Sequence, residues 1–288
     1  MDLKTVYKVE DIKEVLELLG EYQDRGRLIA GGTDLIIKLR EKRLRPEVLI
    51  DISDLSEIKG IKETEDMLIQ IGAATTFASI ARAPLFQTNL RGLAEAARSV
   101  GSPQIRNAAT IGGNICNASP AADIIPPLLT LDATITIKGR EEEAAMSLED
   151  FLLDKGVVKL ETNQMLYNIA FEKPNANQSL GFAKLGLRKA LAISRIAVAI
   201  FIEVEEKQFR RVRVATGACG KLALREFLIE EFLNNKAITD QIIEEASELF
   251  KAQIEARLQG RNAAEYKAVA IKGVFLEALC KALSYQNK

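Results

Sequence analysis

The sequence predicts an α/β domain followed by a smaller α+β domain. Its 288 residues are more than one hydrophobic core usually organises, so we expect more than one structural unit. Short strand-like runs alternate with helical stretches in the first part, which is typical of α/β domains. A polar segment at residues 173–179 separates this part from alternating runs that are followed by helices. We therefore predict domains at residues 1–175 and 176–288.

The beginning of the chain shows strand and helix patterns in turn. Apolar residues at helical spacing between charged ones, such as Val15 and Leu19, predict a surface helix packed by one face. Short runs rich in Ile, Leu and Val predict buried strands. In order, we expect a helix at 11–22, a strand at 28–30, a helix at 35–43, strands at 48–52 and 67–71, and a helix that starts at 75–77.

The rest of the first domain surrounds a glycine-containing loop that we predict over residues 109–123. A helix at 91–100 and residues 103–107 lead to this loop. After it come an apolar segment at 124–131, a strand at 133–137, a solvated hairpin tip at 141–143 and a strand at 165–171.

The second domain reads as a small sheet backed by helices. Apolar and alternating runs at 181–187, 196–205 and 211–217 predict a three-stranded meander. Helical patterns follow at 222–233, 240–258 and 262–283. One face of the last helix is apolar, through Ala264, Ala268, Ile271, Val274, Phe275, Ala278 and Leu279. This face predicts core packing, although an interface with a partner protein stays an alternative.

Composition narrows the class of function. The net charge is −1, and no cluster of Lys or Arg is interleaved with aromatic residues, which argues against a nucleic-acid partner. No apolar run approaches the length that crosses a bilayer, and Met1–Lys4 opens into polar sequence rather than a signal peptide. We therefore expect a cytoplasmic protein without a membrane segment.

The histidine and cysteine content points to chemistry carried by a cofactor. The chain has no histidine, which excludes Ser-His-Asp and Cys-His mechanisms and a flavin attached to a histidyl ring. Cys116, Cys219 and Cys280 stand far apart without the spacing of an iron–sulfur or zinc site. We expect these thiols to pack rather than react, no metal site, and no catalytic side chain, so that a bound cofactor supplies the reactivity.

Two Gly-Gly turns are the strongest motifs in the chain. Glycine lets main-chain N–H groups approach an anion without a Cβ in the way. The first turn lies in Leu28–Leu35 and the second in the 109–123 segment, each beside residues suited to starting a helix. Thr33 or Asp34 is expected to cap the helix that follows the first turn. We expect the pair of loops to bind the two phosphates of one dinucleotide, and valine at Gly112 and Gly113 to remove the ligand while leaving much of the fold.

The motifs together resemble the FAD-binding medium subunits of molybdenum hydroxylases, the flavoprotein subunits of xanthine dehydrogenase, carbon monoxide dehydrogenase and nicotinate dehydrogenase. The resemblance covers the whole chain. It implies a two-part FAD-binding domain of the vanillyl-alcohol-oxidase (PCMH) type, with lobes at about 1–55 and 56–175, and then a small C-terminal domain. The residues that carry it are Ala30-Gly31-Gly32-Thr33-Asp34-Leu35, Ile71-Gly72-Ala73-Ala74-Thr75-Thr76, Thr110-Ile111-Gly112-Gly113-Asn114-Ile115 and Ser119-Pro120-Ala121-Ala122-Asp123.

The resemblance also implies the residues that contact a non-covalent FAD. They are Leu28, Ile29, Ala30, Gly31, Gly32, Thr33, Asp34 and Leu35 in the first loop, Thr110, Ile111, Gly112, Gly113 and Asn114 in the second, and Val100, Asp123, Leu166 and Lys184 elsewhere. Asp34 is as well explained by helix capping as by ligand contact, because its carboxylate would repel a diphosphate. Lys184 is expected either to be solvated on a strand or to approach the isoalloxazine, where its charge would stabilise reduced flavin.

The function implied is that of the electron-output subunit of a hetero-oligomer. A small subunit with 2Fe-2S clusters would deliver electrons to FAD, NAD or another acceptor would receive them, and a separate molybdopterin subunit would hydroxylate a substrate, such as an N-heteroaromatic purine or nicotinate. Eukaryotic xanthine dehydrogenases carry an acidic pair where this chain has residues 187–192, which weakens the expectation of nicotinamide docking. Two alternatives remain: a free-standing flavin reductase or oxidase, whose FAD would be bleached by NADH in the isolated chain, and a non-catalytic flavin- or nucleotide-binding module.

Overall fold

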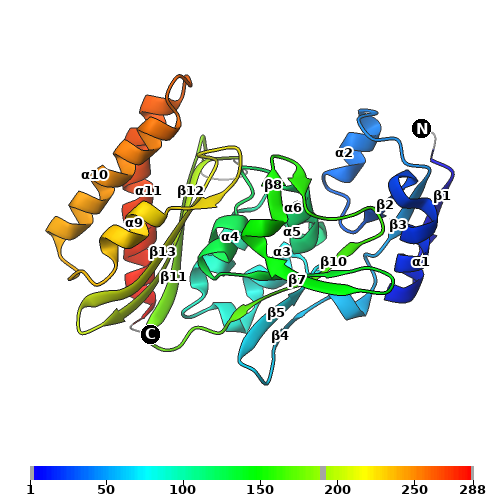
Figure 1. Cartoon of the computed structure of the whole chain (residues 1–288), viewed down its shortest axis with the longest axis horizontal. Coiled ribbons are helices and arrows are strands. Elements are labelled where there is room, and N and C mark those ends of the chain that lie inside the picture. The colour runs from blue at the N-terminus through cyan, green and yellow to red at the C-terminus, as the bar shows by residue number, and fades with distance from the viewer. Residues whose placement is uncertain (1–2, 189–192, 287–288) are drawn as a thin grey trace.

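The computed structural model describes residues 3–188 and 193–286. Its first unit is a parallel sheet of three strands in the order β1–β3–β2, formed by β1 (Thr5–Lys8), β3 (Val48–Asp51) and β2 (Gly26–Ile29). Helix α1 (Ile12–Tyr22) buries Val15 and Leu19 in the core beside this sheet, and Asp11 caps its first turn. Helix α2 (Leu35–Arg40) follows the first Gly-Gly turn (Figure 1).

The second unit is a five-stranded antiparallel sheet in the order β4–β5–β10–β6–β7. Alternating burial along β5 and β6 puts one face of the sheet into the core, as the apolar alternation predicts. Several short helices pack against that face (Figure 1). The strands are β4 (Ile61–Glu63), β5 (Leu68–Gly72), β6 (Thr134–Lys138), β7 (Glu143–Ser147) and β10 (Met165–Glu172); the helices are α3 (Phe77–Arg82), α4 (Arg91–Ser99), α5 (Pro103–Ala108), α6 (Ile111–Asn117), α7 (Ile125–Thr130) and α8 (Leu148–Phe151), and a small hairpin adds β8 (Leu152–Asp154) and β9 (Val157–Val158).

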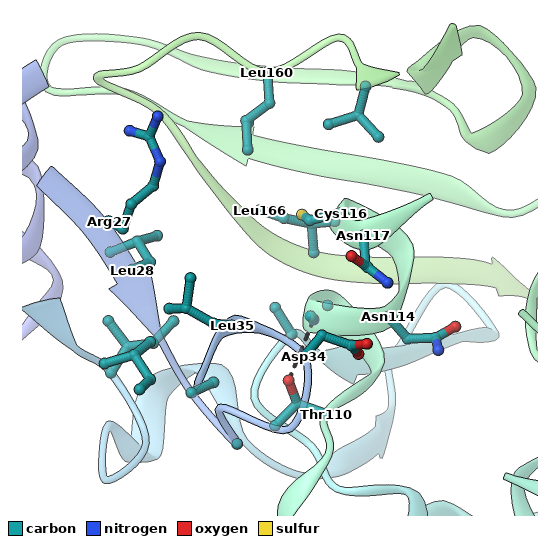
Figure 2. A pocket seen from close by; sticks show the side chains of 18 of the residues that line it. Arg27, Leu28, Asp34, Leu35, Thr110, Asn114, Cys116, Asn117, Leu160 and Leu166 are labelled. Atoms are coloured by element: carbon teal, nitrogen blue, oxygen red, sulfur yellow. Dashed lines mark hydrogen bonds between the residues drawn. The ribbon is translucent and has the colours of Figure 1, made fainter. Parts of the chain in front are cut away.

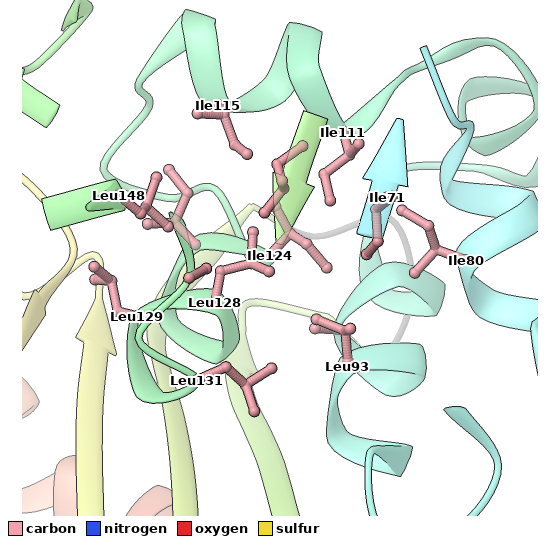
Figure 3. Packing of buried hydrophobic residues seen from close by; sticks show 14 of the residues in the cluster. Ile71, Ile80, Leu93, Ile111, Ile115, Ile124, Leu128, Leu129, Leu131 and Leu148 are labelled. Atoms are coloured by element: carbon pink, nitrogen blue, oxygen red, sulfur yellow. The ribbon is translucent and has the colours of Figure 1, made fainter. Parts of the chain in front are cut away.

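The core of this second unit is a continuous cluster of aliphatic side chains (Figure 3). Ile71 from β5, Leu93 from α4 and Ile111 from α6 are all fully buried in it. One face of helix α6 therefore packs on this core through Ile111 and Ile115. The opposite face remains available to line a cavity.

The C-terminal unit is a four-stranded antiparallel sheet that is buried on both faces. Along β12, Ala197 and Ala199 join the core of the preceding domain, while Ile196, Val198 and Ile200 join a separate core with the C-terminal helices. Helices α10 and α11 lie along the outer side of the sheet (Figure 1). The elements are β11 (Gln178–Gly186), β12 (Ser194–Glu205), β13 (Gln208–Gly217), β14 (Leu224–Arg225), α9 (Phe227–Leu233), α10 (Asp240–Arg257) and α11 (Ala264–Tyr285). Because one sheet belongs to two cores, the two parts pack as one body.

Most of the predicted elements are present, with three corrections. Residues 111–117 of the expected loop form helix α6, because the Thr110 hydroxyl caps the first turn despite the two glycines. Residues 222–233 are not one helix: Leu224–Arg225 pairs with β13 and makes a fourth strand before α9 begins. Residues 103–108 are helical after a cap at Ser102. Residues 189–192 of the 187–192 segment lie outside the described residues.

No helix in the described part of the chain combines the length and the apolar character that a membrane crossing requires.

Candidate functional site

A cavity of about 550 Å³ lies between the first sheet, helix α6 and the segment that follows β8. This volume falls within the ordinary range for small-molecule sites. Figure 2 shows Asp34 and Thr110 on one side of the cavity and Leu160 on the opposite side. The predicted residues in its wall are Leu28, Ile29, Ala30, Gly31, Gly32, Thr33, Asp34, Leu35, Thr110, Gly112, Gly113, Asn114 and Leu166. The two glycine loops, about eighty residues apart in the chain, therefore border one space.

The two loops are in direct contact at Gly31. A Cβ built on Gly31 would lie 1.9 Å from the carbonyl oxygen of Ala108 and 2.9 Å from the amide nitrogen of Ala109. No side chain fits in that space. The next residue, Gly32, has a φ of +66°, a left-handed conformation that favours glycine. Gly31 thus allows the two loops to pack in direct contact, and Gly32 adopts the left-handed conformation that leads the chain into α2.

The glycines of the second loop have different roles. Gly112 faces Ala73, whose Cβ and carbonyl oxygen would lie 2.7 and 2.8 Å from an added Cβ. Gly113 is exposed, and an added Cβ there would approach only the Thr110 hydroxyl, at 3.0 Å. The expectation that valine at both positions would leave much of the fold, with both side chains beside the ligand, is therefore wrong for Gly112, because an added Cβ there meets Ala73 rather than the cavity. Gly113 is the glycine whose missing side chain leaves room in the cavity.

Capping differs between the two helices that start at these loops. Thr110 accepts a hydrogen bond from the Gly113 amide at 3.2 Å, as a helix cap does (Figure 2). Asp34 precedes α2 without accepting such a bond, and no Thr33 side-chain cap is present at this helix. The predicted cap at Thr33 or Asp34 is therefore wrong. The Asp34 carboxylate is exposed at the cavity instead.

Polar groups in the cavity wall show what ligand would complete it. Asn114 lines the cavity, and its Oδ1 is buried without a hydrogen-bond partner. An orphaned buried acceptor is costly, so a donor from a ligand is expected there. Lys38 donates to Asn117 Oδ1 at 2.6 Å and thereby links α2 to α6. The wall thus combines the bare backbone of the first loop, an unpaired amide oxygen and apolar side chains such as Leu166. This combination suits a ligand with a phosphate group, a hydrogen-bond donor and an apolar part.

Cys116 forms part of the wall but has the character of a packing residue. Burial raises the pKa of its thiol to about 12, so the group stays protonated at neutral pH. All three cysteines are free. The interpretation of Cys116 as inert is consistent with this direction of shift.

Four predicted site residues lie outside the cavity wall. The Ile111 side chain is fully buried in the core (Figure 3). Val100 ends α4, and its carbonyl accepts from Arg106 at 2.9 Å. Asp123 is buried, and Lys184 donates to its Oδ2 at 2.6 Å and to the Ser99 carbonyl at 3.0 Å.

The Lys184–Asp123 pair joins the two domains. Asp123 also accepts from Ser99, at 3.0 Å, and from Ser194 on β12, so both carboxylate oxygens have protein donors. Only 16% of the Lys184 side chain is exposed, which excludes the solvated lysine considered from the sequence. Contact of Val100, Ile111, Asp123 and Lys184 with a cofactor stays a prediction.

One side of the cavity was not predicted from the sequence. Residues of the 156–164 segment line the same cavity as the glycine loops, and so do Lys38 and Asn117. Lys38 lies one turn after Asp34 on a helix next to the first loop, a signal that was available in the sequence. The 156–164 segment carries no comparable motif, because it reaches the site only through the β8–β9 hairpin.

Comparison with known proteins gives matches over nearly the full length. Residues 2–173 match the family described as "FAD binding domain in molybdopterin dehydrogenase", and residues 182–282 match the "CO dehydrogenase flavoprotein C-terminal domain". The nicotinate dehydrogenase FAD-subunit of Eubacterium barkeri is 34% identical, over 92% of this chain and 90% of that protein. A putative xanthine dehydrogenase FAD-binding subunit of Escherichia coli is 30% identical over 98% and 97%.

Solved structures agree with these matches. A carbon monoxide dehydrogenase chain from Hydrogenophaga pseudoflava superposes with a TM-score of 0.88 at 25% identity and covers 97% of this chain and 98% of its own. A chain of quinoline 2-oxidoreductase from Pseudomonas putida shares the fold, with a TM-score of 0.86 at 22% identity and coverage of 99% and 98%. The chain therefore belongs to the FAD-binding flavoprotein family of the molybdopterin dehydrogenases, which are oxidoreductases.

Proposed function

We propose that the chain holds FAD non-covalently in the cavity between the two glycine loops and serves as the electron-output subunit of a heteromeric molybdenum hydroxylase. The observation that carries this proposal is the convergence of both loops and the unpaired Asn114 Oδ1 on one cavity of about 550 Å³. Family membership supports the identity of the cofactor.

The chain's own residues would bind and orient the cofactor. The first-loop amides near Gly32 and the start of α2 would stabilise the diphosphate, and the open space at Gly113 would admit it. Asn114 Oδ1 would accept from a cofactor donor, and apolar wall residues would exclude water. FAD, when bound, supplies two-electron storage that single-electron donors are able to fill. No general base is required of the protein, in keeping with a chain that has no histidine.

The relatives support a set of partner subunits. A nicotinate dehydrogenase FAD-subunit and a xanthine dehydrogenase FAD-binding subunit are components of larger enzymes by name. For this chain we propose a small subunit with 2Fe-2S clusters as electron donor, NAD or another compound as acceptor, and a molybdopterin subunit that hydroxylates an N-heteroaromatic such as a purine or nicotinate. Residues 1–175 would be the FAD-binding domain and residues 176–288 the C-terminal domain.

The proposal is tested on the protein purified from its native complex. We expect flavin absorbance, FAD released into the supernatant by acid or heat, and two copurifying proteins, one cysteine-rich and one large. Release is expected because the chain offers no histidine for covalent attachment, and burial raises the pKa of the Cys116 thiol in the wall, which keeps it protonated and unreactive. Flavin that stays with the precipitate, or a complex without flavin, would contradict the proposal. Rapid bleaching of FAD by NADH in the isolated chain together with no copurifying subunit would favour a free-standing reductase.

A further inference from the structure

Lys38 is a cation in the cavity wall without a carboxylate partner. Its ammonium donates to the neutral Asn117 Oδ1 at 2.6 Å. Within residues 3–188 and 193–286, no Asp or Glu side chain lies at ion-pair distance from it. A partly buried ammonium has three donors, and burial of its charge is unfavourable unless an opposite charge is near. The side chain is therefore suited to an anionic ligand.

The Lys38–Asn117 bond also lies between the two loops. Lys38 is on α2, which follows the first loop, and Asn117 ends α6, which starts at the second. Because the ammonium occupies Asn117 Oδ1, the donors that remain on the amide are its two N–H bonds. Figure 2 shows the Asn117 side chain near Cys116 and Leu166 of the cavity wall. Ammonium and amide thus offer N–H donors to the same space as the glycine loops.

The other charged groups of the wall are less suited to this role. Arg27 donates to the carbonyl oxygens of Asp24 and Gly26, at 2.9 and 2.7 Å. Asp34 and Glu161 are exposed carboxylates, which would repel a phosphate. Among the four charged residues, Lys38 is the cation that has a neutral side chain as its only protein partner in the described structure.

We propose that Lys38, held by Asn117, is the counter-ion for the phosphate groups of the bound cofactor. The proposal rests on the proposed FAD site and adds a cation to loops that otherwise offer only backbone dipoles. It predicts that the affinity for phosphate-containing flavins depends on Lys38. The affinity for riboflavin, which has the same ring without phosphate, should not depend on it.

The test is a fluorescence titration of the flavin-free full chain with FAD and with riboflavin. Lys38→Gln is expected to raise the dissociation constant for FAD about tenfold to a hundredfold, and to leave that for riboflavin unchanged. Lys38→Arg should keep most of the FAD affinity, because it keeps the charge. Arg40→Gln is the matched control, since Arg40 is exposed on the same helix and is outside the cavity wall. Circular dichroism verifies that each variant is folded.

The salt dependence of flavin binding by the wild-type chain provides a second test, which does not require that any variant folds correctly. Binding of FAD should weaken as NaCl concentration rises, while binding of riboflavin should not, because salt screens only the charged contact. The proposal is overturned if Lys38→Gln binds FAD as tightly as the wild type, if it loses FAD and riboflavin equally, or if salt affects both ligands alike. In each of these cases FAD binding itself persists in the wild type. Failure of the wild-type chain to bind FAD would instead overturn the proposed function and this inference together.

Discussion

Gly31→Ala is expected to destabilise the folded chain by about 3 kcal/mol or more and to abolish FAD retention. The added Cβ would lie 1.9 Å from the Ala108 carbonyl oxygen, so the two loops must separate to admit it. The loops border the cavity, and their separation would also displace the groups proposed to hold the diphosphate. Thermal unfolding followed by circular dichroism measures the first effect, and flavin absorbance after gel filtration measures the second.

Gly273→Ala is the matched control for this change. Gly273 lies inside helix α11 with no atom within 4 Å of an added Cβ. The same substitution should there be neutral or stabilising by up to about 1 kcal/mol, because alanine favours helices more than glycine does. If Gly31→Ala unfolded at the wild-type temperature and kept its FAD, the close approach of the loops would not be what holds the site together.

Glu226→Ala is expected to reduce the free energy of unfolding by about 3–5 kcal/mol. Glu226 is fully buried and accepts from Arg257 at 2.7 and 2.5 Å and from Gln253 at 3.0 Å. The Thr216 hydroxyl on β13 also donates to it. Without the carboxylate, the Arg257 guanidinium would remain partly buried with no opposite charge. Urea unfolding of the full chain measures the difference.

Two variants show whether the loss comes from the buried ion pair. Glu231→Ala, at an exposed glutamate on helix α9, which begins directly after Glu226, should change stability by less than about 0.5 kcal/mol. The double variant with methionine at Glu226 and at Arg257 should recover part of the loss, because it removes both charges and keeps the volume. Equal stability of Glu226→Ala and the wild type would mean that water replaces the carboxylate without penalty.

The sequence predicted the features that depend on local patterns. The apolar spacing of Val15 and Leu19 predicted the buried face of α1, and the apolar run along β12 predicted a strand. The two glycine turns predicted that both loops border one space, and thirteen of the seventeen residues implied by the family resemblance line one cavity. Each of these features is set by neighbours in the chain or by a motif, which the sequence displays directly.

Features that depend on packing between distant segments were not predictable. The contact of Gly31 with Ala108 and of Gly112 with Ala73 decides which glycine borders the cavity, and neither contact is marked in the sequence. The apolar sequence of β12 predicts a strand that is buried on both faces. It does not show that the two faces belong to two different cores. The pairing of Asp123 with Lys184 likewise depends on how β11 packs against the first domain.

The most direct test of the account is the affinity of Gly113→Val for FAD. Gly113 is the loop glycine whose added side chain would enter the cavity and otherwise approach only the Thr110 hydroxyl. If FAD lies between the loops, this variant should unfold at nearly the wild-type temperature yet bind FAD at least about a hundredfold more weakly, because the valine would occupy the space of the cofactor. A folded Gly113→Val chain that binds FAD with unchanged affinity would show that the cofactor lies elsewhere.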